Sequence, residues 1–239
     1  MTSVAARHTA APTFDAAELT RILQAELASP SCRPPLLPAV AMEVMELAQT
    51  PEWFTERLNR HATATAHVAR LLCKRRGLPG EHAFMCGLLH DIGFSAALLI
   101  VAEREGSRSV PFPALAPVLD AVHTDASGLL AWLWKLPTPL ADVLGSHHDG
   151  VVDGQARPLN AALILAEQLC WEAGAGVLAP PRDADSDALE SPDQPLDGID
   201  ANWATSVEKA EEIVGLEARA VRADAFALVE ELGLGERIA

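Results

Sequence analysis

The chain has 239 residues, of which 49% are hydrophobic and 21% are charged, a composition typical of a globular domain with a substantial core. Its 18 basic and 33 acidic residues leave a formal net charge of −15. This charge argues against a nucleic-acid polymer as partner, because phosphate binding needs a basic surface, and against an anionic membrane. No apolar run reaches the roughly 20 residues of a membrane span, and the N-terminus lacks the apolar core of a secretory signal. The four cysteines form no C-x-x-C pair, which argues against a zinc ribbon or a thioredoxin-like site and fits a reducing cytosol. We therefore expect a cytoplasmic protein that binds neither membrane nor nucleic-acid polymer.

Apolar residues recur at helical spacing along most of the chain, and no stretch alternates with the period of two that indicates a strand. The sequence therefore predicts an all-α fold. We expect four regions: a disordered tail (1–12), a helical core (13–173), an acidic and proline-rich loop (174–200) and C-terminal helices that pack on the core (201–239).

Capping residues, prolines and glycines divide the core into helices. Pro111, Pro113 and Pro117 predict a linker in the middle of the core, and the composition of 149–158 predicts a second loop. In chain order, helices are expected at about 15–27, 38–50, 53–76, 81–90, 94–105, 126–135, 139–147 and 159–173, followed by two amphipathic helices at 203–214 and 217–232.

The histidines carry most of the chemical information. His90 and Asp91 end an apolar helix, where they can present an imidazole and a carboxylate to one divalent cation. The carboxylate can also bridge two cations, because both of its oxygens accept. Such a dipeptide also arises by chance, and an exposed helix end is the alternative interpretation.

Other candidates lie on separate predicted helices. His147 and His148 can serve one site only from a helix end or an irregular turn, since consecutive helical residues diverge by about 100°. His61 can face inward, whereas His123, which precedes a predicted turn, is by itself most typical of a surface or cap residue. Glu167 interrupts an apolar helix and needs a metal, an arginine or a helix edge as partner. Converging helices can bring such side chains together inside a bundle.

Three segments resemble the HD superfamily of metal-dependent phosphohydrolases: HATATAHVARLLCKRRGLPGEHAFMCGLLHDIG, HTDASGLLAWLWKLPTPLADVLGSHHD and NAALILAEQL. Within that superfamily the chain is most similar to the HDOD signalling domains. The features that carry this similarity are LPAVAMEVMELA near the start, WKLP before the double histidine and GLEARAV near the end. The resemblance implies a multi-helix HD-domain-like bundle for the core.

The resemblance also implies a ligand set. His61, His90, Asp91 and Glu167 would bind a first metal, and His123, His147 and His148 would surround a second, with Asp91 as the bridge. The dyad of His90 and Asp91 would also be catalytic in an active member. Two such cations suit phosphoester hydrolysis, because they lower the pKa of a shared water and stabilise the charge that develops on phosphorus. Imidazole and carboxylate ligands fit Fe, Mn, Zn or Ni.

The chain departs from the family pattern in four places. Glu167 stands where members usually have Asp. Phe94 stands at the lysine position of the branch that hydrolyses cyclic di-GMP. The loop after the double histidine is DGVVDGQARP and lacks the GYP motif of that branch. The segment between the LPAV helix and His61 is shorter than in typical HDOD domains.

Two functions are therefore weighed. The departures favour a regulatory HDOD module that acts on signalling protein partners. The nearly complete ligand set favours an active metal-dependent phosphodiesterase that acts on a nucleotide or a cyclic dinucleotide, because ligands are expected to erode once catalysis is lost. Metal content distinguishes the two, since only the enzyme requires one or two bound divalent ions.

Overall fold

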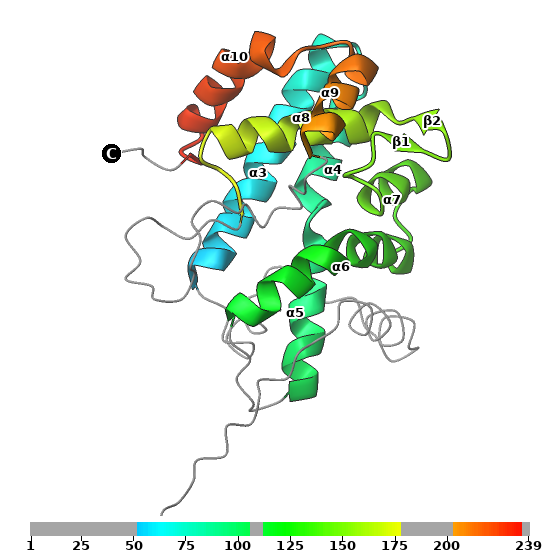
Figure 1. Cartoon of the computed structure of the whole chain (residues 1–239), viewed down its shortest axis with the longest axis vertical. Helices are drawn as coiled ribbons and strands as arrows, with labels where there is room; N and C mark the ends of the chain where they lie inside the picture. Colours follow the sequence, from blue (N-terminus) through cyan, green and yellow to red (C-terminus); the bar gives the residue numbers. More distant parts are fainter. Residues whose placement is uncertain (1–51, 106–111, 178–202, 236–239) are drawn as a thin grey trace, which may run out of the picture.

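A computed structural model describes residues 52–105, 112–177 and 203–235. Helices form nearly all the regular structure of these residues, which confirms the predicted all-α fold (Figure 1). The predicted tail, the two predicted helices before residue 52 and most of the acidic loop lie outside the described residues. The elements are α3 (Glu52–Arg75), α4 (Gly80–Leu89), α5 (Ile92–Glu105), α6 (Phe112–Leu133), α7 (Thr138–Leu144), β1 (Val151–Val152), β2 (Gln155–Ala156), α8 (Pro158–Glu172), α9 (Trp203–Val214) and α10 (Ala218–Glu231).

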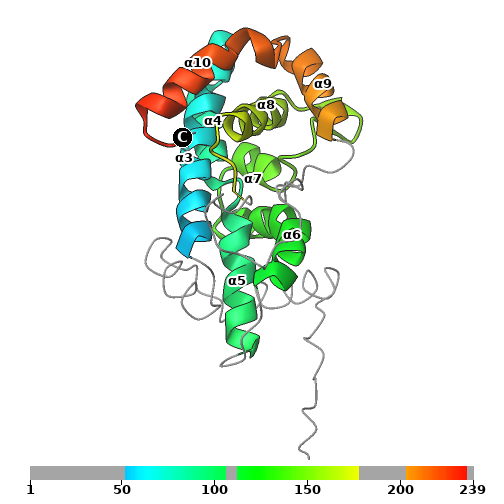
Figure 2. The ribbon, with the colours of Figure 1, turned by 60° about the vertical axis from the view of Figure 1, so that its left-hand side comes forward.

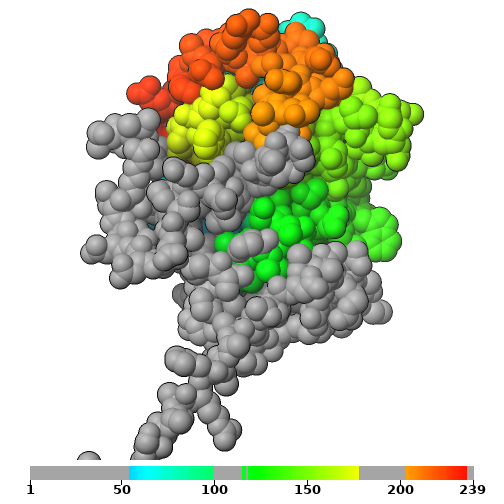
Figure 3. Space-filling view, in the orientation of Figure 1, coloured from blue at the N-terminus to red at the C-terminus, as the bar shows by residue number. Residues whose placement is uncertain are grey.

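Helix α8 lies at the centre of a hydrophobic core. It packs against α3, α4, α9 and α10, and its residues from Asn160 to Glu167 are all buried. Burial on every side explains why its sequence is apolar nearly all round. In the ribbon views, α10 and α5 lie at opposite ends of the molecule (Figures 1 and 2). The space-filling view shows α9 and α10 together covering the end that holds α8 (Figure 3).

The long helix α3 ends as the sequence predicts. Gly77 adopts φ +67, a left-handed conformation that costs glycine little. The amide of Leu78 donates to the carbonyl of Cys73 at 2.9 Å, and that of Gly77 donates to the carbonyl of Lys74 at 3.4 Å. These two bonds form a Schellman cap, which turns the chain into α4.

The linker predicted from the prolines is wrong where the structure describes it. Pro113 and Pro117 lie inside α6, which begins at Phe112 and runs on without a break to Leu133. Proline is tolerated near the start of a helix, where the first N–H groups have no intrahelical partner. Burial of Leu115 and Leu119 stabilises this first part of the helix and outweighs the one hydrogen bond that Pro117 cannot make. As a result, His123 lies in the middle of α6, not before a turn.

The loop predicted after the double histidine contains a small β-hairpin. Strands β1 and β2 pair antiparallel, with Val151 opposite Ala156 and Val152 opposite Gln155. The two residues between them, Asp153 and Gly154, both have positive φ, as a two-residue type I′ turn requires. Sequence reasoning missed this Asp-Gly signal because each strand has only two residues. No helix in the described ranges is both long and apolar enough to cross a bilayer.

Candidate metal centre

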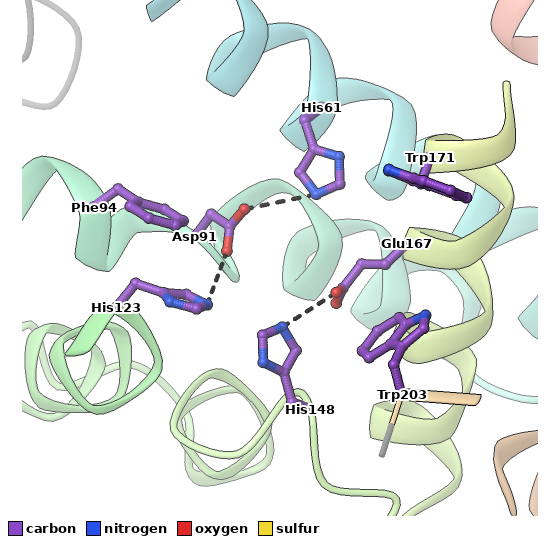
Figure 4. Close-up of a pocket in the computed structure, with 8 residues that line it drawn as sticks. All are labelled: His61, Asp91, Phe94, His123, His148, Glu167, Trp171 and Trp203. Atoms are coloured by element: carbon purple, nitrogen blue, oxygen red, sulfur yellow. Dashed lines mark ion pairs between the residues drawn. The ribbon is translucent and has the colours of Figure 1, made fainter. Parts of the chain in front are cut away.

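Seven donor side chains from five parts of the fold meet at one point in the bundle (Figure 4 labels five of them). Six of the seven side chains are buried, and His148 is 23% exposed. They are His61 from the middle of α3, His90 and Asp91 from the turn between α4 and α5, His123 from α6, His147 and His148 from the turn after α7, and Glu167 from α8.

The Asp91 carboxylate lies between two groups of histidines. Its Oδ2 atom is 3.2 Å from His90 Nε2 and 3.6 Å from His61 Nε2. Its Oδ1 atom is 3.6 Å from His123 Nε2 and 3.7 Å from His147 Nε2. Each carboxylate oxygen therefore serves one group, the arrangement that a carboxylate bridging two cations requires.

Glu167 contacts both groups from the opposite side. Its Oε2 atom is 3.2 Å from His148 Nε2, and its Oε1 atom is 4.0 Å from His90 Nε2. Because His148 belongs to the second group, the carboxylate of Glu167 lies nearer to that group than its sequence-based assignment to the first metal implies. The donors of the two groups, His61 with His90 and Asp91, and His123 with His147 and His148, each lie within 4.8 Å of one another.

The main chain fixes the orientation of four imidazoles. Their Nδ1 atoms lie 2.6–3.0 Å from carbonyl oxygens. A carbonyl oxygen only accepts, so each Nδ1 carries the proton and each Nε2 is left to face the cluster. Such hydrogen bonds select the tautomer that a histidine ligand needs. The pairs are His61 with Ala175, His90 with Gly87, His123 with Asp120, and His147 with Leu144.

Comparison with known proteins agrees with this geometry. Residues 35–150 match the family model of the HDOD domain. The chain carries an HDOD domain. The match includes every histidine of the cluster and Asp91, whereas Glu167 lies beyond it. It supports a regulatory HD-like domain, with which the histidine and aspartate cluster is compatible.

Relatives add little to the HDOD assignment. A protein of Treponema pallidum (strain Nichols), described as uncharacterized, is 29% identical over 104 residues, which make up 39% of this chain and 20% of that protein. The chain thus spans about a fifth of the length of this curated relative. No solved structure matches the chain.

HD-type domains bind divalent metals, and the donor set of this HDOD domain fits such an ion. Two buried donor atoms, His147 Nε2 and Glu167 Oε1, have no hydrogen-bond partner within the described part of the chain. A buried polar atom without a partner is costly, and a cation between the groups would satisfy both. Imidazole nitrogens and carboxylate oxygens are ligands for Fe, Mn, Zn and Ni alike, so the donors do not specify the metal.

In the metal-free cluster, burial and the two neighbouring carboxylates decide which histidines are protonated. Burial alone would lower the pKa of His90, but Asp91 and Glu167 outweigh it and raise that pKa to about 9. Burial lowers the pKa of His123 to about 4, more than the attraction of Asp91 can offset. Burial also lowers the pKa of His147, whereas Glu167 overcomes burial and raises the pKa of His148. The metal-free centre therefore favours protons on His90 and His148, which belong to different groups.

Aromatic rings line the space beside the donors, a hollow of about 340 Å³ that includes volume open to solvent. The Phe94 ring is buried and stacks on the His123 ring, with centroids 4.5 Å apart and planes within 5°. Trp171 and Trp203 lie beside Glu167 (Figure 4). Trp203 is held by a hydrogen bond from its Nε1 to Gln168 Oε1 at 2.7 Å. Among the described residues, this lining includes no lysine or arginine.

The structure brings together all seven residues chosen from the sequence, and their role as metal ligands stays a prediction. The interpretation of His123 as a surface or cap residue is wrong in the fold, because its side chain is 3% exposed and faces Asp91. Sequence reasoning missed the carbonyl of Ala175, which accepts from His61 across 114 positions of sequence. It also missed Trp203 as a wall residue, and no local pattern could have revealed either contact.

Proposed function

We propose that this HDOD domain is a signal-transduction module that acts on partner proteins and holds one or two divalent metal ions. The ions would bind between His61, His90, Asp91, His123, His147, His148 and Glu167. Support for the metal comes from the four imidazoles whose Nδ1 protons are engaged by main-chain carbonyls, with the Nε2 atoms turned toward Asp91 and its neighbours.

The regulatory role depends on one observation, the absence of a lysine or arginine side chain from the described walls of the site. A phosphoester carries negative charge, and hydrolysis places more charge on its oxygens. Phe94 fills a position beside the donors where a lysine could have neutralised that charge, and its ring stacks on His123 instead. Two acidic side chains already lie in the site, so an anionic substrate would depend on the metal ions alone.

A second candidate is a phosphodiesterase acting on a nucleotide or a cyclic dinucleotide. The observation in its favour is the pair of tryptophans beside Glu167. Trp171 is 42% exposed, although a large aromatic side chain is usually well buried. A nucleobase can stack on such a ring. Divalent ions bound at the centre would supply Lewis acidity toward the phosphoester. In this function Asp91 and His90 would position the reacting groups.

Metal analysis combined with a turnover assay tests both candidates. We expect purified wild-type protein to contain transition metal, and the His90→Ala and Asp91→Ala variants to lose it. His82→Ala is the matched control, because His82 is exposed on α4 and lies outside the cluster. A metal content below roughly 0.2 equivalents in wild-type protein would contradict the metal centre.

Cyclic dinucleotides and a generic phosphodiester serve as substrates in the turnover assay. A regulatory module should give the same background rate in wild-type protein and in both variants. Turnover that requires His90 and Asp91, and survives in His82→Ala, would overturn the regulatory function in favour of the enzyme.

A further inference from the structure

One buried hydroxyl ties the turn that carries His90 and Asp91 to helix α6. Ser127 is fully buried. Its Oγ donates to the carbonyl oxygen of His90 at 2.5 Å and accepts from the amide of Gly93 at 2.9 Å. Both partners belong to the main chain where α4 gives way to α5, His90 just after the end of α4 and Gly93 in the first turn of α5, and Ser127 lies more than thirty positions later in the sequence.

These two main-chain groups are ones that a helix leaves without a partner. The carbonyl of His90 follows the last residue of α4, and the amide of Gly93 belongs to the first turn of α5. The last carbonyls and the first amides of helices have no intrahelical partner. One hydroxyl of Ser127 therefore caps the end of one helix and the start of the next, with the dyad of His90 and Asp91 held between its two hydrogen bonds.

The same helix delivers His123 to the site. Ser127 follows His123 by one helical turn, so both residues lie on one face of α6. A Cβ atom added to Gly93 would lie 1.9 Å from the carbonyl oxygen of His123 and 2.8 Å from the amide nitrogen of Ser127. The start of α5 thus touches α6 backbone to backbone, with no side chain between them that could yield.

This contact joins the two donor groups. His90 and the Oδ2 atom of Asp91 belong to the first group, and His123 belongs to the second. The distance from His123 to Asp91 therefore depends on how the turn is held against α6. Ser127 makes the side-chain hydrogen bonds that hold it there.

We propose that Ser127 is a positioning residue that sets the spacing of the two donor groups around Asp91, an inference that rests on the proposed metal centre. Ser127 itself does not reach the donors. It acts through the main chain of His90 and Gly93, so its loss should weaken metal binding and change the separation of two bound ions. Outer-shell partners of metal ligands typically contribute 10- to 100-fold to metal affinity.

Titration with manganese(II) tests the proposal, with the affinity and stoichiometry measured by calorimetry. The spin coupling of the two-ion form, measured by electron paramagnetic resonance, reports their separation. We expect Ser127→Ala to bind manganese about 10- to 100-fold more weakly than wild type and to change or lose the coupled signal. Val229→Ala is the matched control, because Val229 is buried in α10, a helix that contributes no donor. It should lower thermal stability and keep wild-type affinity and coupling.

The outcomes separate the inference from the proposed function. Wild-type protein that binds no manganese would overturn the metal centre and this inference with it. Wild-type protein that binds two ions, together with a folded Ser127→Ala variant of equal affinity and unchanged coupling, would overturn the inference alone. An equal loss of affinity in Val229→Ala would also overturn it, since the effect would then follow from stability. If Ser127→Ala does not fold, Ser127→Cys replaces it under the same criteria, because a thiol is a similar shape and a weak donor.

Discussion

The Nε2 atoms of His61 and His90 lie 3.2 Å apart, although both rings already donate their Nδ1 protons to main-chain carbonyls. Two unprotonated nitrogens at this distance would direct their lone pairs at each other. In the metal-free protein a proton on His90 removes the conflict, consistent with its pKa of about 9, where Asp91 and Glu167 outweigh the effect of burial. A metal ion in the same gap would remove the conflict and also engage Asp91.

Metal binding should therefore stabilise the fold. A ligand that binds only the folded state at a hundred times its Kd adds about 2.7 kcal/mol to the free energy of unfolding. For a chain of this size that corresponds to a rise in Tm of about 5 to 10 °C. We expect the rise when manganese or zinc is added to protein treated with a chelator, and its reversal by more chelator. Calorimetry measures the shift, and an unchanged Tm would contradict it.

Asp91 should matter to both donor groups, because each of its oxygens faces one of them. We expect Asp91→Asn to reduce bound metal to less than about a tenth of the wild-type content, because a neutral amide binds cations poorly. Glu167→Gln should cause a smaller loss, since Glu167 has one close contact, with His148 at 3.2 Å, and lies 4.0 Å from His90. Mass spectrometry of the purified variants measures the content. Asp125→Asn, on the exposed face of α6, should retain the wild-type content.

The stability of the metal-free protein should be greatest near pH 6.5 and fall on both sides. His123 has its pKa lowered to about 4 by burial, so the stability it contributes above pH 6.5 is lost as the pH falls from 6.5 through 4. His90 has its pKa raised to about 9, so the stability it contributes below pH 6.5 is lost as the pH rises from 6.5 through 9. Urea denaturation in the presence of a chelator measures the profile.

A variant can separate the loss of stability on the acidic side from the loss on the alkaline side. His123→Asn should reduce the loss of stability on the acidic side, to which His147 also contributes through its lowered pKa, and should leave the loss on the alkaline side unchanged. A profile that rises or falls monotonically from pH 4 to 9 in wild-type protein would show that His90 and His123 do not titrate in the directions given above.

The sequence was informative where local pattern decides the structure. Helix α9 begins and ends at the residues that amphipathic periodicity predicts, and α3 ends at its glycine cap. Local pattern failed at α6, where prolines suggested a linker but burial of the helix decided otherwise. Intrinsic preference is a weak predictor when tertiary packing opposes it.

At the candidate site, too, some features could be recognised from the sequence and others depend on tertiary packing. The candidate donors could be chosen from their residue types together with the family resemblance, and the structure brings them together. The groups that orient them could not be recognised, because the carbonyl of Ala175 contacts the His61 ring, and the hydroxyl of Ser127 contacts the main chain of His90, only through the packing of distant segments. Any residue offers a carbonyl, and serine hydroxyls are common, so neither has a signal in the sequence.

Gly93 should tolerate no side chain. A Cβ atom there would lie 1.9 Å from the carbonyl oxygen of His123, a distance that requires the start of α5 or α6 to move. We expect Gly93→Ala to lower the free energy of unfolding by about 3 kcal/mol, the upper part of the usual range for overpacking, and also to weaken metal binding. Gly77→Ala is the control: its added methyl group meets nothing within 4 Å, and its positive φ alone costs about 1–2 kcal/mol. Denaturant melts and manganese titrations of both variants measure the two effects. If both variants lose stability but keep wild-type affinity, the close approach of α5 to α6 supports the fold without shaping the centre.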